Sequence, residues 1–513
     1  MKNSMKYAAL LAPLMFSGAA RADVKLPAIF SDNMVLQRDM SVPIFGTADA
    51  GESVTVRLGA SNVGRTRADA SGKWLVRLAP QSAATSLTLS VVAKNALTFQ
   101  NVAVGEVWLA SGQSNMEFKV SQTQNADAEI ASANFPEVRS FNVAKNAVPT
   151  PQSDVKGKWQ ATTPETVKNF SAVAYFFGRE LHQNLGVPIG LIHSSWGGTP
   201  AEAWTSREAL ENVPTLQPMV AATDKVAAEF PALNEKYQKE TLPAYDAAVA
   251  AAKAANQPAP VKPGGPNSPN SPNRAAALYN GMIAPLIPYG IKGAIWYQGE
   301  SNASRAVEYR TLFPTLIQDW RARFGQGDFP FYWVQLANFQ GVQKDPIEPG
   351  NGWAMLREAQ SRTLSLPRTG TALAIDLAIK ENPGNIHPTN KQDVGHRLAL
   401  LALNRDYGQK VVDSGPVFSS MSAQGNTARL SFQNADGLKA SGDKLLGFAI
   451  SGADGIWKWA DATIDGNQIV LSNPEVSAPV AVRYDWASNP IGNLYNGAGL
   501  PARPFRTDVN AEK

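Results

Sequence analysis

Three short apolar runs, each followed at once by a glycine-containing turn, constrain the fold of this chain more than any other feature. The first is Glu106 to Ala110, which leads into the turn Ser111 to Met116 (SGQSNM). The second lies in IGLIHSSWGG, which begins at Ile189, and the third opens the segment GAIWYQGESN at Gly293. Helical segments separate these runs, as a three-layer α/β fold requires. Open parallel sheets gather active sites at the carboxyl ends of their strands, so we expect the three turns to meet.

One residue of the first turn, Ser114, has the setting of a nucleophile. A serine hydroxyl becomes nucleophilic when a base lies within hydrogen-bond reach and donors await the oxyanion. A serine on a tight turn between a strand and a helix is exposed enough to have both. Read alone, the hexapeptide is better explained as a polar turn that ends a strand. The assignment therefore needs a base elsewhere in the chain.

The base has to come from four histidines, which are His182, His193, His387 and His396. His182 and His396 fall in amphipathic helical patterns, and His193 closes a short apolar run, so these three suit structural positions. His387 lies among loop residues in GNIHPTN, where Pro388 keeps it out of the following helix. We therefore predict that His387 is the general base.

The second and third turns offer donors for an oxyanion. Gly197 and Gly198 allow backbone N–H groups to approach a ligand closely. In the third turn, the carboxamide of Gln298 can donate a hydrogen where the oxyanion would form. Turns of this kind are common in α/β proteins, and only their combination with a loop histidine is specific.

In chain order the motifs read GQSNM, WGGT, WYQGESN and IHPTNK. This order resembles that of the sialate O-acetylesterase-type branch of the SGNH (GDSL-like) hydrolases. The resemblance covers nearly all of the chain after residue 22, including LPAIFSDNMVLQ near the start and the segment from Val482 to Asp508. It implies a three-layer α/β/α, flavodoxin-like catalytic domain with accessory β-sandwich regions at both ends.

Carried onto this sequence, the resemblance implies Ser114 as the nucleophile and His387 as the base. The backbone N–H of Ser114, one of Gly197 and Gly198, and the side chain of Gln298 would form the oxyanion hole. The implied reaction removes O-acetyl groups from a carbohydrate through an acetyl-serine intermediate, which water then hydrolyses.

The chain departs from the usual SGNH pattern at the orienting acid. That pattern has an aspartate three residues before the histidine, and here the position is Gly384. A histidine base still needs its second ring nitrogen held in one tautomer. A backbone carbonyl meets this need, and so does one of three carboxylates. These carboxylates are Glu381, Asp376 and Glu300.

Several side chains beside the motifs are suited to sugar binding. Aromatic faces stack on sugar rings, and we select Trp204 and Trp353 from the twelve tryptophans as a platform. Arg357 can bond a substrate hydroxyl or carboxylate, and Gln113 and Asn115 flank the serine. A sialate site should present an arginine to the sugar carboxylate. Because tryptophans lie near the motifs and paired arginines do not, we expect an acetylated plant cell-wall glycan, xyloglucan or xylan, with O-acetylated sialate as the alternative.

Residues 1–22 have the pattern of a signal peptide. Lys2 and Lys6 precede an apolar stretch, and Ala20 to Ala22 offers small residues for cleavage. We expect a periplasmic or secreted protein without stable membrane insertion, because the apolar stretch is too short to span a bilayer. With no cysteine and four histidines, we predict no metal and no cofactor. A net charge of +4 over 513 residues gives no support to nucleic-acid binding.

The pattern changes along the chain predict several domains. Residues 23–104 and 408–513 contain short runs of alternating polar and apolar residues, which are typical of small β regions. Residues 105–407 carry the motifs, and we expect them to form the esterase domain that the resemblance implies. Within it, an insertion at about residues 205–274 is helical at first and then rich in Pro, Asn and Ser. This insertion either roofs the active site or decorates the surface.

Two other classes of function remain open at this point. A glycoside hydrolase would need a pair of carboxylates at the mouth of a site, and Glu106, Glu117 and Glu300 lie near the motif turns. A non-catalytic carbohydrate-binding protein would account for the tryptophans and the β regions. It would leave the serine, histidine and glutamine turns unexplained.

Overall fold

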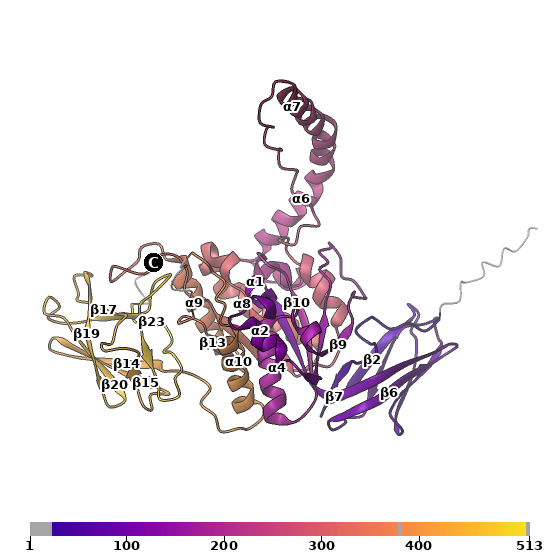
Figure 1. Ribbon diagram of the computed structural model, residues 1–513, viewed down its shortest axis with the longest axis horizontal. Helices are drawn as coiled ribbons and strands as arrows, with labels where there is room; N and C mark the ends of the chain where they lie inside the picture. Colours follow the sequence, from indigo (N-terminus) through magenta and orange to yellow (C-terminus); the bar gives the residue numbers. More distant parts are fainter. Residues whose placement is uncertain (1–22, 378–381, 383, 509–513) are drawn as a thin grey trace, which may run out of the picture.

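The structure is a computed structural model that describes residues 23–377, 382 and 384–508. Figure 1 shows a β region at each end of the molecule, an α/β domain between them, and a helical arm that projects from the middle. The expected signal peptide, residues 1–22, lies outside the described residues, and so does Glu381. Within the described ranges, no helix has both the length and the apolar character needed to cross a bilayer.

A sheet of mainly parallel strands forms the centre of the molecule. Its strand order is β13-β12-β11-β7-β10-β8-β9, and only the β8–β9 pair is antiparallel. The bounds are β7 Ala96–Gly112, β8 Phe135–Asn142, β9 Trp159–Thr162, β10 Ile189–Ser195, β11 Gly293–Tyr297, β12 Phe331–Gln335 and β13 Thr369–Leu373. The turns that follow β7, β10 and β11 therefore lie side by side, because these strands are neighbours.

Helices cover both faces of this sheet, which confirms the predicted three-layer α/β fold. Helices α4 (Ala172–Leu185) and α10 (Lys391–Arg405) pack together on one face, and α8 (Ala306–Phe324) and α9 (Gly352–Arg362) on the other. Trp108 of β7 enters the core of the first pair, and its neighbour Leu109 enters the core of the second. Both strand faces are buried, so the run is apolar without alternation.

Strand β7 is 17 residues long and belongs to two parts of the molecule. Its first part pairs with β6 (Ala84–Val92) and β1 (Val35–Gln37) of the amino-terminal β region. Its last part pairs with β10 and β11. The predicted boundary between residues 104 and 105 falls inside this strand. The other strands of the amino-terminal region are β2 Val42–Thr47, β3 Ser53–Leu58, β4 Asn62–Arg67 and β5 Lys73–Leu78.

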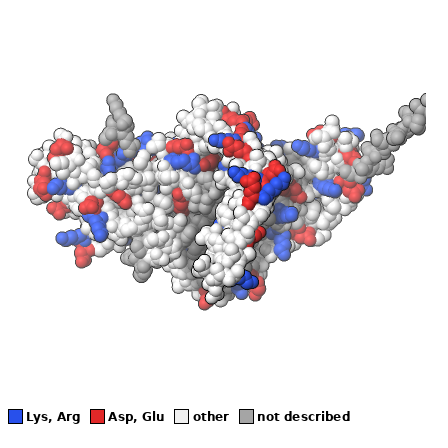
Figure 2. Space-filling model, turned by 90° about the horizontal axis from the view of Figure 1, so that it is seen from above, with Lys and Arg blue, Asp and Glu red and all other residues white. Residues whose placement is uncertain are grey.

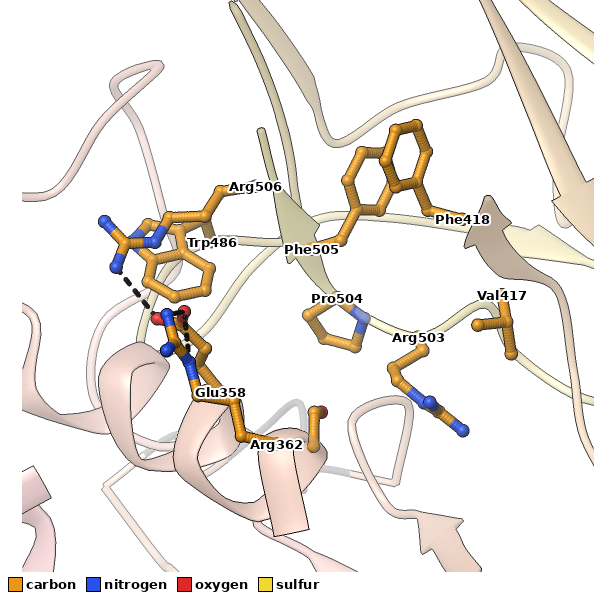
Figure 3. Close-up of a pocket in the computed structure, with 10 residues that line it drawn as sticks. Glu358, Arg362, Val417, Phe418, Trp486, Arg503, Pro504, Phe505 and Arg506 are labelled. Atoms are coloured by element: carbon orange, nitrogen blue, oxygen red, sulfur yellow. Dashed lines mark hydrogen bonds and ion pairs between the residues drawn. The ribbon is translucent and has the colours of Figure 1, made fainter. Parts of the chain in front are cut away.

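The carboxyl-terminal β region has its own apolar core. Its strands are β14 Val417–Gln424, β15 Thr427–Gln433, β16 Lys439–Ala440, β17 Phe448–Ser451, β18 Trp457–Trp459, β19 Asp461–Asp465, β20 Gln468–Ser472, β21 Ala481–Tyr484, β22 Leu494–Tyr495 and β23 Phe505–Arg506. It contacts helix α9, where Arg506 lies 2.9 Å from Glu358. Figure 3 shows Arg506 and Arg362 on either side of this carboxylate, next to Trp486.

The insertion forms the projecting arm. It contains α5 (Arg207–Glu211), α6 (Gln217–Lys236), a π-helical turn (Tyr237–Thr241) and α7 (Leu242–Ala254). Within α6 only Met219 and Val220 are buried, and α7 has no buried residue. Figure 2 shows positive and negative side chains interspersed over the upper face of the molecule, without a large region of one sign.

Candidate active site

The structure brings Ser114 and His387 together. Ser114 begins α1 (Ser114–Glu117), a single helical turn directly after β7. His387 lies in the loop between β13 and α10. Its Nε2 is 2.8 Å from Oγ of Ser114, although the two residues are 273 positions apart in the sequence. This is a hydrogen-bond distance, so a base lies within reach of the half-buried serine hydroxyl.

The other three histidines have partners elsewhere. Nδ1 of His182 bonds the carbonyl of Val187, and Nδ1 of His396 bonds Glu180. His193 is held at both ring nitrogens, by the side chains of Asn142 (2.8 Å) and Ser195 (2.6 Å). Burial lowers the pKa of His193 to about 4, so its ring is neutral near pH 7. All three occupy the structural positions that the sequence indicates.

Close backbone approach fixes the serine turn. In the sheet register, Gly112 at the end of β7 lies opposite Ser195 of β10 and Tyr297 of β11. Gly112 has φ +135°, and a Cβ on this residue would lie 2.2 Å from the carbonyl oxygen of Tyr297. Only glycine fits there, so the chain can turn sharply and expose the next residues at the carboxyl edge of the sheet.

Neither described carboxylate from the sequence analysis orients His387 by direct contact. Asp376 is held by Arg397 at 2.6 and 2.7 Å and also accepts a hydrogen bond from Tyr495. Glu300 accepts one from the side chain of Asn115. In the described part of the chain, no acceptor contacts Nδ1 of His387. The two expectations for Asp376 and Glu300 are therefore corrected, and Glu381 lies outside the described residues.

The expected oxyanion donors also need correction. The Gln298 side chain is fully buried, and its Nε2 donates to Asn302 (2.6 Å) and to the carbonyl of Thr199 (3.2 Å). Both of its hydrogens are used, so Gln298 has none for an oxyanion. The N–H of Gly197 donates to Glu117 at 2.7 Å. Gly198 is exposed, with φ +75° and open space where a Cβ would stand.

The predicted tryptophan platform is wrong. The Trp204 side chain is fully buried; its Nε1 donates to Oγ1 of Thr199, and its ring packs edge-on against Trp296. Trp353 is 9% exposed, donates to the carbonyl of Ala337, and lies 4.9 Å from the ring of Phe339. Both rings belong to the core, so they offer no face to a sugar.

Of the polar side chains selected for substrate binding, Gln113 keeps a free group. Arg357 is buried and bonds backbone carbonyls, including those of Ala487 and Ser488 in the carboxyl-terminal region. Asn115 is fully buried and faces the interior. Oε1 of Gln113 accepts from the N–H groups of the Gly299 turn, and no described residue accepts from its Nε2. The expectations for Arg357 and Asn115 are therefore corrected.

Lys391, which the sequence analysis did not select, lies beneath the serine. It is fully buried, and its ammonium group is 2.5 Å from Oδ1 of Asn115. The ammonium also lies over the rings of Phe118 (4.8 Å) and Tyr297 (5.2 Å). Burial lowers the pKa of Lys391 to about 7, with Glu300 opposing that change. The only signal in the sequence was its place in the motif IHPTNK.

Comparison with known proteins agrees with this arrangement. A family model described as carbohydrate esterase, sialic acid-specific acetylesterase matches residues 268–404. The chain is 32% identical to the sialate O-acetylesterase of Mus musculus, with 94% of each chain covered. It is 30% identical to that of Homo sapiens, with 97% of this chain and 95% of the relative covered. The chain belongs to the sialate O-acetylesterase family.

The esterase is also similar to a solved structure, a carbohydrate acetylesterase from Xanthomonas citri. The TM-score is 0.79 and the identity is 38%, with 95% of this chain and 100% of the other covered. These relatives make the chain a carboxylic ester hydrolase that acts on carbohydrate acetyl esters. The glycoside hydrolase and binding-protein interpretations are thereby set aside.

Beside the serine, the esterase has an exposed ion pair. Lys145 lies 2.6 Å from Glu117, at the end of the helical turn that Ser114 begins. The Lys145 ammonium stands 5.3 Å from the centre of the Trp196 ring. Because Glu117 also holds the N–H of Gly197, this pair joins the first and second motif turns at the surface.

The electrostatics of the site predict the pH dependence of the esterase. Burial and the charge of Lys391 lower the pKa of His387 from its usual value of 6.5. The base must be neutral to accept the serine proton, so a lower pKa extends activity toward acid. We expect the acidic limb of kcat/KM to have an apparent pKa below 6.5. Acetate release between pH 4 and 8 measures it, with unfolding followed at each pH, and a limb at or above about 7 contradicts the prediction.

Proposed function

We propose that this esterase removes O-acetyl groups from sialic acid, with Ser114 as the nucleophile and His387 as the general base. The 2.8 Å contact between Oγ of Ser114 and Nε2 of His387 is the observation that supports the catalytic roles. The family, which is named for sialate esters, supports the substrate.

The reaction follows from this geometry. Nε2 of His387 takes the proton of the Ser114 hydroxyl while Oγ attacks the acetyl carbonyl. Of the expected oxyanion donors, the N–H groups of Ser114 and Gly198 remain, since the N–H of Gly197 and the side-chain amide of Gln298 are bonded elsewhere. Collapse of the tetrahedral species transfers the proton from His387 to the sugar oxygen and releases the alcohol. Water, activated by the same histidine, then frees acetate and restores Ser114.

Charge beside the serine supports an acidic sugar. Lys145 is exposed, and an ammonium group has three donors, so it can hold Glu117 and a substrate carboxylate together. The case for a neutral plant glycan rested on a tryptophan platform and on the lack of paired arginines near the motifs. Its first ground is lost, because Trp204 and Trp353 are both buried. The similar enzyme from Xanthomonas citri is described only as a carbohydrate acetylesterase, which does not specify sialate. Acetylated xyloglucan is therefore tested as a substrate beside O-acetylated sialic acid.

We further propose that the protein is exported, on the pattern of residues 1–22 alone. We expect full-length chain expressed in a Gram-negative bacterium to appear in the periplasm or medium, cleaved after about residue 22. Cell fractionation with mass measurement of the mature amino terminus checks this. A chain that stays uncleaved in the cytoplasm contradicts it.

The catalytic roles predict two inactive variants. We expect Ser114→Ala and His387→Ala each to reduce kcat/KM on the order of 10³-fold or more without loss of folding. His396→Ala is the matched control, because its ring bonds Glu180 on the surface of the helices and should leave activity near that of the wild type. Acetate release from O-acetylated sialic acid, acetylated xyloglucan oligosaccharides and acetylated xylan measures the effect. Substantial activity in either of the first two variants contradicts the mechanism.

The sialate proposal predicts a role for Lys145 in binding. We expect Lys145→Ala to raise KM for O-acetylated sialic acid roughly 5- to 10-fold, because a charge-assisted bond to the carboxylate is lost. KM for a neutral acetylated oligosaccharide should change much less. Lys225→Ala on the arm, also an exposed lysine, controls for net charge. Equal changes in KM for both substrates, or faster turnover of the neutral one by the wild type, contradict the proposal.

A further inference from the structure

We propose that Lys391, Asn115 and Glu300 form a buried charged network that positions the base of this esterase. We call these three residues the Lys391 network. The proposal rests on the roles of Ser114 and His387 given above, and it adds residues that act through the protein rather than on the substrate.

Asn115 is the centre of the network. Its Oδ1 accepts from Lys391, and its Nδ2 donates to Glu300 (2.6 Å) and to the carbonyl of Ile386 (2.9 Å). The oxygen and both Nδ2 hydrogens are therefore engaged. Asn115 directly follows Ser114, and Ile386 directly precedes His387. One buried side chain thus joins the residue after the nucleophile to the residue before the base.

The charges on either side of Asn115 fix its orientation. The Lys391 ammonium can only donate and an ionised Glu300 can only accept, so a flipped carboxamide would place N–H against ammonium and oxygen against carboxylate. In the described part of the chain, Asn115 is the only hydrogen-bond partner of the Lys391 ammonium. Removing an ionic group from water is costly, and the bond to Asn115 and the nearby Glu300 offset that cost only while the three stay together.

Among the described residues no acid orients the His387 ring directly, and this network holds the base instead. The usual aspartate position is Gly384, and Asp376 is held by Arg397. In place of a carboxylate on the ring, the bond from Asn115 to the carbonyl of Ile386 holds the backbone from which the ring projects. Phe118 adds a second restraint, because its ring is stacked near that of His387 (6.3 Å) and lies under the Lys391 ammonium (4.8 Å).

The network also sets the charge around the base. Among the described groups that face His387, Ser114 is neutral and Lys391 is the cation; Glu300 faces Lys391 from the far side of Asn115. The Tyr297 hydroxyl stays protonated, because burial raises its pKa well above the usual value. The positive charge of Lys391 opposes protonation of His387 and so helps to keep the ring in its basic form.

Three variants separate position from charge in the full-length mature protein. Asn115→Asp keeps the shape but removes both donated hydrogens, so the bond to Ile386 is lost. Lys391→Met removes the ammonium at similar length. The double variant Lys391→Met/Glu300→Gln removes both charges and keeps an acceptor at position 300 for Asn115. Lys292→Met is the matched control, because the Lys292 ammonium also lies over an aromatic ring, that of Tyr407. Lys292 directly precedes β11, so it lies at the opposite edge of the sheet from Ser114.

We expect Asn115→Asp and Lys391→Met to lower kcat on the order of 10- to 100-fold with little change in KM, because a displaced base slows chemistry more than binding. In the double variant we expect kcat to recover in part and the acidic limb of kcat/KM to move to higher pH by up to about one unit. Lys292→Met should match the wild type. A merely structural role would lower the melting temperature without moving the pH profile.

Unchanged kcat in Asn115→Asp, together with an unmoved acidic limb in the double variant, overturns the network. If Lys391→Met does not fold, the other two variants carry the same test. Ser114→Ala measured alongside separates the two proposals. A wild type that releases no acetate, or an active Ser114→Ala variant, overturns the proposed function and the network with it. An inactive Ser114→Ala variant beside normal network variants overturns the network alone.

Discussion

The rest of the structure depends on the backbone pairing of one strand, β7. Its amino-terminal half is built into the first β region and its carboxyl-terminal half into the central sheet, between β10 and β11. A strand bonded on both sides over its last residues cannot shift in register without breaking two ladders. The position of Ser114, two residues after the end of β7, is therefore fixed at the carboxyl edge of the sheet.

At that point the protein accepts an electrostatic cost. Lys391 is fully buried next to Asn115, and burial raises the pKa of Glu300 on the other side of Asn115. Apolar side chains of similar size at these two positions would avoid the free-energy cost of removing charges from water. The gain is orientation. The Asn115 carboxamide lies between an ammonium that only donates and a carboxylate that only accepts, so it has one favourable orientation. In that orientation its Nδ2 also donates to the carbonyl of Ile386 and so holds the His387 loop. In the described part of the site, the base is therefore held through this carboxamide rather than by a direct hydrogen bond between an acid and the ring.

The sequence predicted the parts of the site that chain order and scarcity define, and it failed where side-chain direction decides. Ser114 and His387 could be found because the motif turns follow strands and only one histidine lies in a loop. Gln298, Trp204, Trp353 and Arg357 sit beside the same motifs, but packing turns each of them inward, and a sequence carries no direct record of that direction. Lys391 was missed for the converse reason: a lysine at the start of a helix reads as solvated, and here it is buried. The predicted domain boundary at residue 104 falls inside one strand, because β7 pairs with the amino-terminal β region up to Gly105 and with β10 of the central sheet from Glu106.

The inward residues connect the carboxyl-terminal β region to the site. Arg357 of α9 donates hydrogen bonds to the carbonyls of Ala487 and Ser488, which attach this helix to the carboxyl-terminal β region. The same helix presses on the third motif turn: a Cβ on Gly299 would lie 2.5 Å from Leu356, and Gln360 donates to the carbonyl of Gln298. That turn supplies Glu300, which faces Asn115. A contact chain therefore runs from the outer β region through α9 and Glu300 to the residue beside the nucleophile, which makes the accessory region part of the support of the catalytic centre rather than an appended module.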